Sequence, residues 1–383
     1  MFPRWLAAGL TVLTVTACGG GGAPATPSAA PAAGPLAGVC PPTVVVQTDW
    51  FPEAEYGAYF HMLGENPAFD SDAKKVTAPL VDGGAPTGVQ LEIRYGGPAI
   101  GYQQVSAQLY ADKTITLGLV STDEAIQNSA ELATVAVATP LETSPQMIMW
   151  DPAKHPDVHT IADLGTKGVP VLYYQTDTYM QYLLGAGLLR PEQVDGSYDG
   201  SPSRFVASGG DVAVAGFATS EPYIYKNELG EGRGYDTDLQ LVADTGYPMY
   251  GQSLSVRAAD KDALAPCLTK LVPVVQRSAV AYATDPAPTN DVIVAAVQAD
   301  AGSVWSYSPG LAGFAATAMR DRKIVGNGPD ATLGNFDTTR VARMIEALEP
   351  VFAAQQKPIE QGLTPEQLVT NEFVDQTIGL PAP

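Results

Sequence analysis

The 383-residue chain contains little that points to catalysis or to nucleic-acid binding. It has only three histidines and three cysteines, and 21 basic residues against 41 acidic ones. No His-Glu-x-x-His, Gly-x-Ser-x-Gly or Walker-type phosphate motif occurs, so no nucleophile with an obvious base is indicated. Nucleic-acid binding requires a basic stripe that displaces counterions from phosphates, and the sequence supplies none. We therefore expect no catalytic residue, no metal, no cofactor and no nucleic-acid partner.

The start of the chain has the pattern of a targeting segment. An apolar run, Trp5–Ala17, follows Arg4 and ends at Val15-Thr16-Ala17-Cys18. The run is shorter than the roughly 20 residues that a membrane-spanning helix needs. The arrangement resembles a bacterial lipoprotein signal, in which the cysteine becomes both the new N-terminus and the lipid anchor. An ordinary cleaved secretory signal with an incidental Cys18 is the alternative.

The residues after this signal are expected to form a tether, which we place at 18–40. The stretch Gly19–Gly38 consists almost entirely of Gly, Ala, Pro, Ser and Thr, and such a stretch buries too little apolar surface to fold. Removal of residues 1–17 takes away Arg4 and leaves a net charge of −21. A polybasic patch for anionic lipids is absent. We expect a lipid on Cys18 alone to hold the protein at the outer face of the bacterial cytoplasmic membrane.

The other two cysteines are candidates for a disulfide. If Cys18 is lipidated, Cys40 and Cys267 are left as a pair in an oxidising compartment. A bridge between them would close a loop of roughly 227 residues, for which chain-entropy estimates give about 4 to 5 kcal/mol. Two separate buried thiols are the alternative.

Strands and helices alternate through the first 220 residues, and helices dominate beyond Asp260. This order predicts an α/β fold with a parallel sheet. About 345 residues follow the tether, more than one hydrophobic core usually serves, so two lobes are expected. Strands are predicted at 43–47, 89–94, 114–120, 133–138, 146–150, 169–174 and 212–216, and helices at 55–63, 103–111, 179–184, 261–283, 288–300, 338–354 and 364–378.

Five short segments occur in an order that resembles a known family. The chain is similar to the substrate-binding proteins of ABC importers, in the group that takes up thiamine-pyrimidine precursors, riboflavin-like compounds, nitrate or sulfonates. The similarity extends over about residues 43–375. The segments are Asp49-Trp50-Phe51-Pro52-x-x-x-x-Gly-x-Tyr, Gly96-Gly97-Pro98, GLVSTDE at 118–124, GFATSEPY at 216–223 and LTPEQLVTNEFV at 363–374.

The resemblance implies a two-lobed periplasmic-binding-protein-like fold with a ligand cleft between the lobes, two hinge crossings and a helical C-terminal part. The implied boundaries are 41–143 for the first part of lobe 1, 144–247 for lobe 2 and 248–383 for the return to lobe 1. Its implied mechanism is closure on one solute, followed by docking onto an ABC permease with its ATPase subunits. Tyr56 stands where pyrimidine-precursor binders often have His, and Ser220 where Asn is common; both departures bear on the ligand rather than on the fold.

Candidate ligand contacts lie at the strand ends, where open α/β sheets bind ligands. Trp50 and Tyr56 are stacking surfaces for a planar ring, and Glu221 is a partner for a ring amine. Core packing, helix capping, a plain turn or a hinge-side salt bridge are the alternative roles for these positions. The candidates are Asp49, Trp50, Tyr56, Gly96, Gly97, Ser121, Thr122, Ser144, Gln146, Tyr174, Thr176, Glu221 and Tyr250.

Charge favours one class of ligand over another. The segment Pro41–Ala73 contains no Lys or Arg, whereas carboxylates are present in it at Asp49, Glu53, Glu55 and Glu65, among others. An oxyanion needs charge-assisted donors, whereas aromatic faces and carboxylates suit a neutral or cationic nitrogen heterocycle. A thiamine-type pyrimidine or related heterocycle is therefore the expected solute. The alternatives are nitrate, a sulfonate or taurine, with Arg94 or Lys113 supplying positive charge, and a secreted enzyme that processes a pyrimidine.

Overall fold

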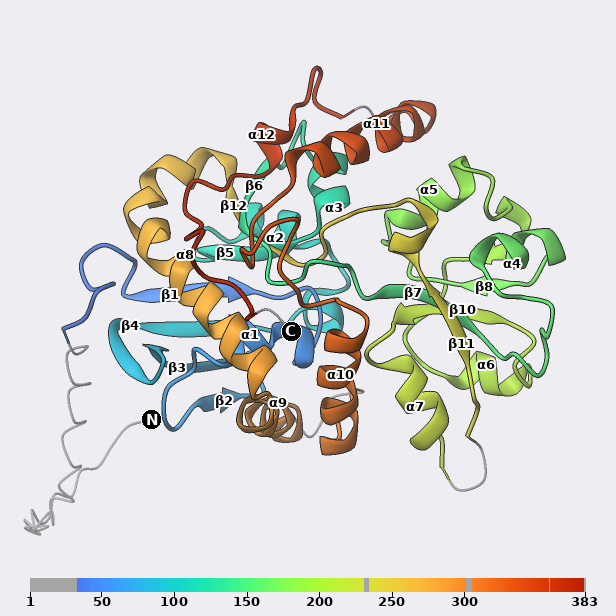
Figure 1. Cartoon of the computed structure of the whole chain (residues 1–383), viewed down its shortest axis with the longest axis horizontal. Coiled ribbons are helices and arrows are strands. Elements are labelled where there is room, and N and C mark those ends of the chain that lie inside the picture. The colour runs from blue at the N-terminus through green and yellow to red at the C-terminus, as the bar shows by residue number, and fades with distance from the viewer. Residues whose placement is uncertain (1–32, 231–233, 301–304, 358, 382–383) are drawn as a thin grey trace, which may run out of the picture. The chain divides into compact units, whose positions relative to one another are not determined.

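The computed structural model describes residues 33–230, 234–300, 305–357 and 359–381, and its strands form two sheets (Figure 1). One sheet has seven strands in the order β2-β3-β4-β1-β5-β12-β6, and the other has five in the order β11-β7-β10-β8-β9. Helices pack around both sheets. This arrangement confirms the predicted two-lobed α/β fold with a helical C-terminal part. Cys18, the predicted lipidation site, and the predicted signal segment lie outside the described residues.

The seven-stranded sheet is built around β1, whose residues Val44–Val46 are buried. β-Branched side chains of this kind favour extended backbone and pack well inside a sheet. β1 pairs in parallel with β4 and β5, while β12 runs antiparallel between β5 and β6. The bounds are β1 Thr43–Gln47, β2 Ala68–Asp70, β3 Lys75–Asp82, β4 Ala85–Arg94, β5 Leu117–Val120, β6 Thr134–Ala138 and β12 Ser253–Arg257.

The five-stranded sheet contains the strands between residues 146 and 241. β10 pairs in parallel with β8 but antiparallel with β7, so both sheets are mixed rather than parallel as the sequence predicted. The chain passes from β6 to β7 and returns from β11 to β12, which makes two crossings between the sheets. The bounds are β7 Gln146–Trp150, β8 Val171–Leu172, β9 Val194–Asp195, β10 Ala213–Phe217 and β11 Asp238–Leu241.

Most helices before residue 260 are short. The helix predicted at 55–63 is divided into a 3-10 turn, η1 Ala54–Tyr56, and one α-helical turn, α1 Gly57–Phe60. In Figure 1, α4 to α7 surround the five-stranded sheet. The remaining bounds are η2 Gly97–Ile100, α2 Val105–Ala111, α3 Thr122–Gln127, α4 Ile161–Lys167, α5 Tyr179–Gly185, η3 Pro191–Gln193, α6 Ser203–Ala207, α7 Glu221–Asn227, η4 Val242–Thr245 and η5 Ala258–Asp260.

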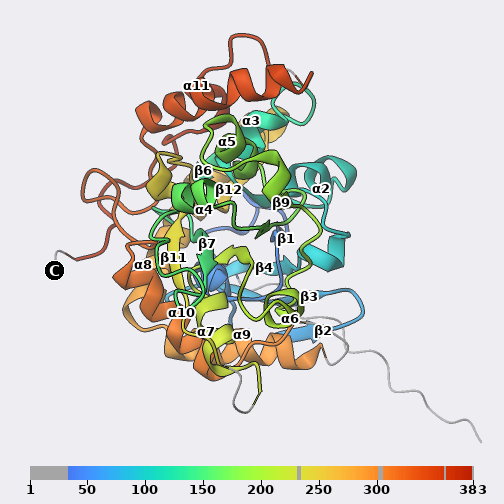
Figure 2. The same cartoon turned by 90° about the vertical axis from the view of Figure 1, so that its right-hand side faces the viewer.

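The C-terminal part is helical, with two differences from the prediction. The helix predicted at 364–378 is only α12 Pro365–Leu368, because the residues that follow form turns such as the one in which Asp375 accepts a hydrogen bond from the Thr377 N–H. Helix α10 was not predicted. α11 contacts both α3 and α5, and therefore touches helices of both sheets (Figures 1 and 2). The bounds are α8 Lys261–Thr284, α9 Ala287–Ala299, α10 Pro309–Asp321 and α11 Thr338–Ala354.

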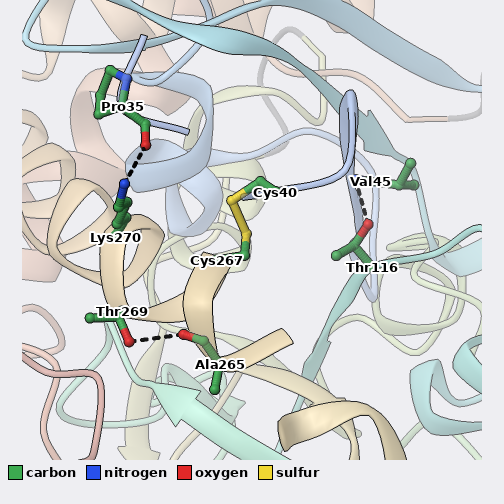
Figure 3. The surroundings of a disulfide bond; sticks show 8 residues. All are labelled: Pro35, Cys40, Val45, Thr116, Ala265, Cys267, Thr269 and Lys270. Carbon is green, nitrogen blue, oxygen red and sulfur yellow. Dashed lines mark hydrogen bonds between the residues drawn. A yellow bond between two sulfur atoms is a disulfide. The ribbon is translucent and has the colours of Figure 1, made fainter. Parts of the chain in front are cut away.

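Cys40 and Cys267 form a disulfide, as predicted, and it joins the segment before β1 to α8 (Figure 3). The same segment is fixed by other contacts. The Lys270 ammonium donates to the Pro35 carbonyl at 3.1 Å, and the Leu36 side chain is fully buried. The folded part of the chain therefore begins before residue 40, where the sequence placed the end of the tether.

Membrane-spanning character is missing from the helices of the described residues: none combines the length and the apolar composition of a bilayer span.

Candidate functional site

A pocket of about 160 Å³ lies between strand ends of the two sheets. From the seven-stranded sheet, Asp49 and Trp50 follow β1, and Ser121 follows β5. From the five-stranded sheet, Tyr174 follows β8 and Glu221 begins α7 after β10. Side chains at these strand ends can face a common space, as in other open α/β sheets. A space of this volume can hold a small solute.

Aromatic rings form one part of the pocket wall, with Trp50 at their centre. The Trp50 ring centroid lies 5.5 Å from that of Tyr174 and 6.0 Å from those of Tyr102 and Trp305. Gly97 adopts a φ of 57°, and a Cβ added there would come within 2.6 Å of the Trp50 ring. A glycine is therefore required beside the indole. Because the four aromatic residues come from distant parts of the chain, the wall forms only in the folded protein.

Carboxyl groups form the other part of the wall. Six line the pocket, at Asp49, Glu53, Asp123, Glu124, Asp177 and Glu221, and Glu55 lies close to them. Within the described part of the chain, no Lys, Arg or His lines the pocket. An ionised carboxylate without a positive partner is costly to bury, so this composition creates a site that favours positive charge.

Burial raises the pKa values of these carboxyl groups. The pKa is about 7 for Glu55, Glu124, Asp177 and Glu221, in each case chiefly because burial penalises the charged form. The pKa of Glu53 is raised well above its ordinary value by burial and then by repulsion from Glu55. These carboxyl groups are therefore partly protonated near neutral pH when the pocket contains no cation.

Asp49 is positioned by two neighbouring side chains. Its Oδ1 accepts hydrogen bonds from the Tyr56 hydroxyl at 2.7 Å and from the Gln252 amide at 3.1 Å. Burial has the larger effect and raises the pKa of Asp49, whereas these hydrogen bonds lower it. Asp49 is thus held in a fixed orientation at the end of β1.

Hydrogen bonds connect the two sides of the pocket, one of which belongs to each sheet. The Thr219 hydroxyl donates to Glu55 Oε1, and the Thr178 hydroxyl donates to Gln127 Oε1 at 2.9 Å. Thr178 and Thr219 belong to the five-stranded-sheet side, whereas Glu55 and Gln127 belong to the side of the seven-stranded sheet.

In the described residues, no group of three or more His, Cys, Asp or Glu is arranged to hold a metal ion.

The structure brings together most of the site residues predicted from the sequence. Eight of them line the pocket: Asp49, Trp50, Gly97, Ser121, Gln146, Tyr174, Thr176 and Glu221.

Five predicted residues lie outside the lining and have structural partners. Tyr56 is fully buried behind Asp49, and Gly96 packs so closely that an added Cβ would be 2.3 Å from the Thr48 carbonyl oxygen. The Thr122 hydroxyl accepts a hydrogen bond from the Tyr250 N–H at 3.0 Å. The Tyr250 ring lies under the Arg340 guanidinium, and the Ser144 hydroxyl accepts from the Gln146 N–H at 3.3 Å.

Other lining residues were not proposed as ligand contacts. Glu53 belongs to the acidic segment without Lys or Arg, and Asp123 and Glu124 belong to the Ser-Thr-Asp-Glu tetrad that begins α3, so sequence signals for these three existed. Trp305 reaches the pocket from the C-terminal part, and no local pattern indicated it. The remaining residues of this kind are Tyr102, Gln103, Gln104, Val105, Asp177, Thr178, Tyr179, Gly216, Phe217 and Ser220.

Comparison with solved structures shows the periplasmic-binding-protein fold. The periplasmic aliphatic sulphonate binding protein SsuA from Escherichia coli is similar with a TM-score of 0.53 and 12% identity, over 90% of this chain and 95% of that one. The zinc-bound ligand-binding component of an ABC-type import system from Staphylococcus aureus gives 0.53 and 11%, over 86% and 98%. A protein of Bordetella bronchiseptica RB50 gives 0.52 and 14%, over 87% and 96%. No protein-family model and no curated protein matches the sequence.

Proposed function

We propose that this protein is an extracytoplasmic solute-binding protein of an ABC importer. In this proposal residues 41–143 and 248–383 form one lobe and 144–247 the other, and the lobes close on the solute before docking onto a permease. The shared fold with import-system binding proteins supports the role. A lipid on Cys18 would hold the protein at the outer face of the cytoplasmic membrane. We propose no catalytic function.

The proposed solute is a small, planar, nitrogen-containing molecule, either neutral or cationic, such as a thiamine-pyrimidine precursor. The observation that carries this choice is the pocket wall itself, which combines carboxyl groups and aromatic rings with no basic side chain in the described lining. A sulfonate or nitrate would lose its hydration without gaining a charge-assisted donor from Lys or Arg. A cation gains both carboxylate partners and aromatic faces.

A thermal-shift screen tests this proposal. Ligand at 100 times its dissociation constant should stabilise the protein by about 2.7 kcal/mol. The screen would compare aminopyrimidines, thiamine, flavins and polyamines with nitrate, taurine and alkyl sulfonates. We expect stabilisation by cationic heterocycles and none by the oxyanions. Stabilisation by the oxyanions alone would contradict the choice of solute and favour the nitrate or sulfonate alternative.

A further inference from the structure

Three oxygen atoms of pocket-lining side chains have no hydrogen-bond partner among the described residues. They are Glu53 Oε1, Gln146 Oε1 and Ser220 Oγ. The side chains of Glu53 and Ser220 are 2% exposed, so bulk water does not satisfy them. A buried acceptor without a donor costs about 1 to 3 kcal/mol, and native proteins rarely retain one without a reason. These atoms indicate that hydrogen-bond donors arrive with a ligand.

The three atoms belong to one end of the pocket. Gln146 pairs with Phe217 across β7 and β10, and the Phe217 N–H donates to Glu221 at 2.7 Å. Ser220 immediately precedes Glu221. The Thr219–Glu55 hydrogen bond brings this segment to the one that carries Glu53. We call this end, defined by Glu53, Gln146, Ser220 and Glu221, the acceptor end.

Three donors near the acceptor end are committed to other groups. The Tyr56 hydroxyl and the Gln252 amide both donate to Asp49, and the Thr219 hydroxyl donates to Glu55. A bound solute can supply the missing donors. Since the nearby carboxylates favour positive charge, a donor group that also carries a positive charge fits best.

We propose that the solute presents to the acceptor end a planar cation with at least two N–H donors, of the amidinium, guanidinium or protonated amino-heterocycle type. This inference deepens the proposed function and rests on it. Planarity follows from the aromatic wall, because a flat cation can contact the Trp50 and Tyr174 rings while its edge donates N–H groups to the acceptors. A quaternary ammonium has the charge but no donor, and it would leave the acceptors unsatisfied.

A series of phenyl compounds that differ only in the head group separates charge from donors. Benzamidinium is cationic with N–H groups, phenyltrimethylammonium is cationic without them, benzamide is neutral with them, and benzenesulfonate is anionic. Calorimetric titration should give the highest affinity for benzamidinium. Each charge-assisted hydrogen bond is worth about tenfold or more in affinity, so phenyltrimethylammonium should bind at least about tenfold more weakly.

The outcomes distinguish the inference from the proposed function. Equal or tighter binding of phenyltrimethylammonium would overturn the inference and leave the proposal of a cation-binding protein intact. Binding of benzenesulfonate alone would overturn both. Failure of benzamidinium to bind, whatever the other three compounds do, would also overturn the inference.

A charge-removing substitution locates the interaction. Glu53→Gln keeps the shape of the side chain, and it should weaken benzamidinium binding by about tenfold because a charge-assisted bond becomes a neutral one. The ligand-free protein should unfold at the same or a higher temperature, since a buried carboxyl is removed. Glu65→Gln, at an exposed position outside the pocket, is the matched control and should bind benzamidinium normally. Normal affinity in Glu53→Gln would contradict the assignment of the acceptor end.

Discussion

The sequence allowed two interpretations of Trp50, and the structure gives its side chain one position. The sequence placed it either under a helix in the core or in a ligand site. The indole is half-buried, lines the pocket and contacts rings from both sheets, through Tyr102 and Tyr174. The local segment after β1 made a ligand role predictable. Its contact with Trp305 could not be predicted, because about 250 residues separate the two in the chain.

Trp50→Ala should weaken solute binding by about tenfold or more without unfolding the protein. The substitution removes the ring that a planar solute would stack on, and aromatic pairs contribute about 0.5 to 1.5 kcal/mol each beyond area burial. Calorimetric titration of the best solute from the screen measures the effect.

Tyr110→Ala provides the matched control for this prediction. Tyr110 lies on α2 outside the pocket, packs against the core and donates a hydrogen bond to the Ala133 carbonyl at 2.8 Å. Its loss should lower the unfolding free energy by about 1 to 3 kcal/mol and leave affinity unchanged. Unchanged affinity in Trp50→Ala would show that the indole does not contribute to solute binding.

The raised carboxyl pKa values predict how stability depends on pH. Glu124 and Glu221 have an ordinary pKa of 4.5 and a pKa of about 7 in the folded protein, so the folded state holds these protons more tightly than the unfolded state. Between these values the unfolded chain binds fewer protons, and the ligand-free protein should lose stability as the pH rises from about 4.5 to about 7. Above that range this contribution should be constant.

Denaturant unfolding at a series of pH values measures this dependence. Glu221→Gln removes one titrating group and should flatten the profile. A saturating cationic solute should flatten it as well, because positive charge favours the ionised carboxylates. A ligand-free protein whose stability rises over the same pH range would contradict the argument.

At the scale of elements, the strands most rich in β-branched and apolar residues were the most predictable. Thr43–Gln47 and Gln146–Trp150 have the predicted bounds, because continuous apolar runs of this length favour buried strands. The strand Ser253–Arg257 was not predicted, since it pairs with β5 and β6, which are distant in sequence. The hairpin β2–β3 and helix α10 were not predicted either.

The disulfide should stabilise the fold without affecting the site. It joins the segment before β1 to α8 and closes a loop of 227 residues, and neither cysteine lines the pocket. Replacing both residues, Cys40→Ala with Cys267→Ala, should lower the unfolding free energy by up to about 4 to 5 kcal/mol. Solute affinity below the unfolding transition should be unchanged.

Denaturant unfolding of the oxidised protein and of the double variant tests this prediction. Each single variant serves as a control, because it also lacks the bridge and should lose a similar amount of stability. A large loss of affinity in the folded double variant would show that the bridge positions the pocket.

At the scale of the whole folded part, the pocket depends on residues from both sheets. Asp49, Glu53 and Asp123 come from one side, and Asp177 and Glu221 come from the other. The aromatic wall is also shared, through the contact between Trp50 and Tyr174. The sequence predicted that the strand ends would meet, because the order of the motifs resembles that of two-lobed binding proteins. It could not predict which carboxyl groups would converge, since that depends on how the two sheets face each other.

A crystal structure of the protein with the best solute from the screen tests the central claim most directly. The account predicts that a ring of the solute lies against Trp50. It also predicts a positively charged nitrogen of the solute within about 2.7 to 2.9 Å of a carboxylate oxygen of Glu53 or Glu221. An anionic solute in this pocket, or a solute bound elsewhere while the carboxyl groups stay unpaired, would contradict it.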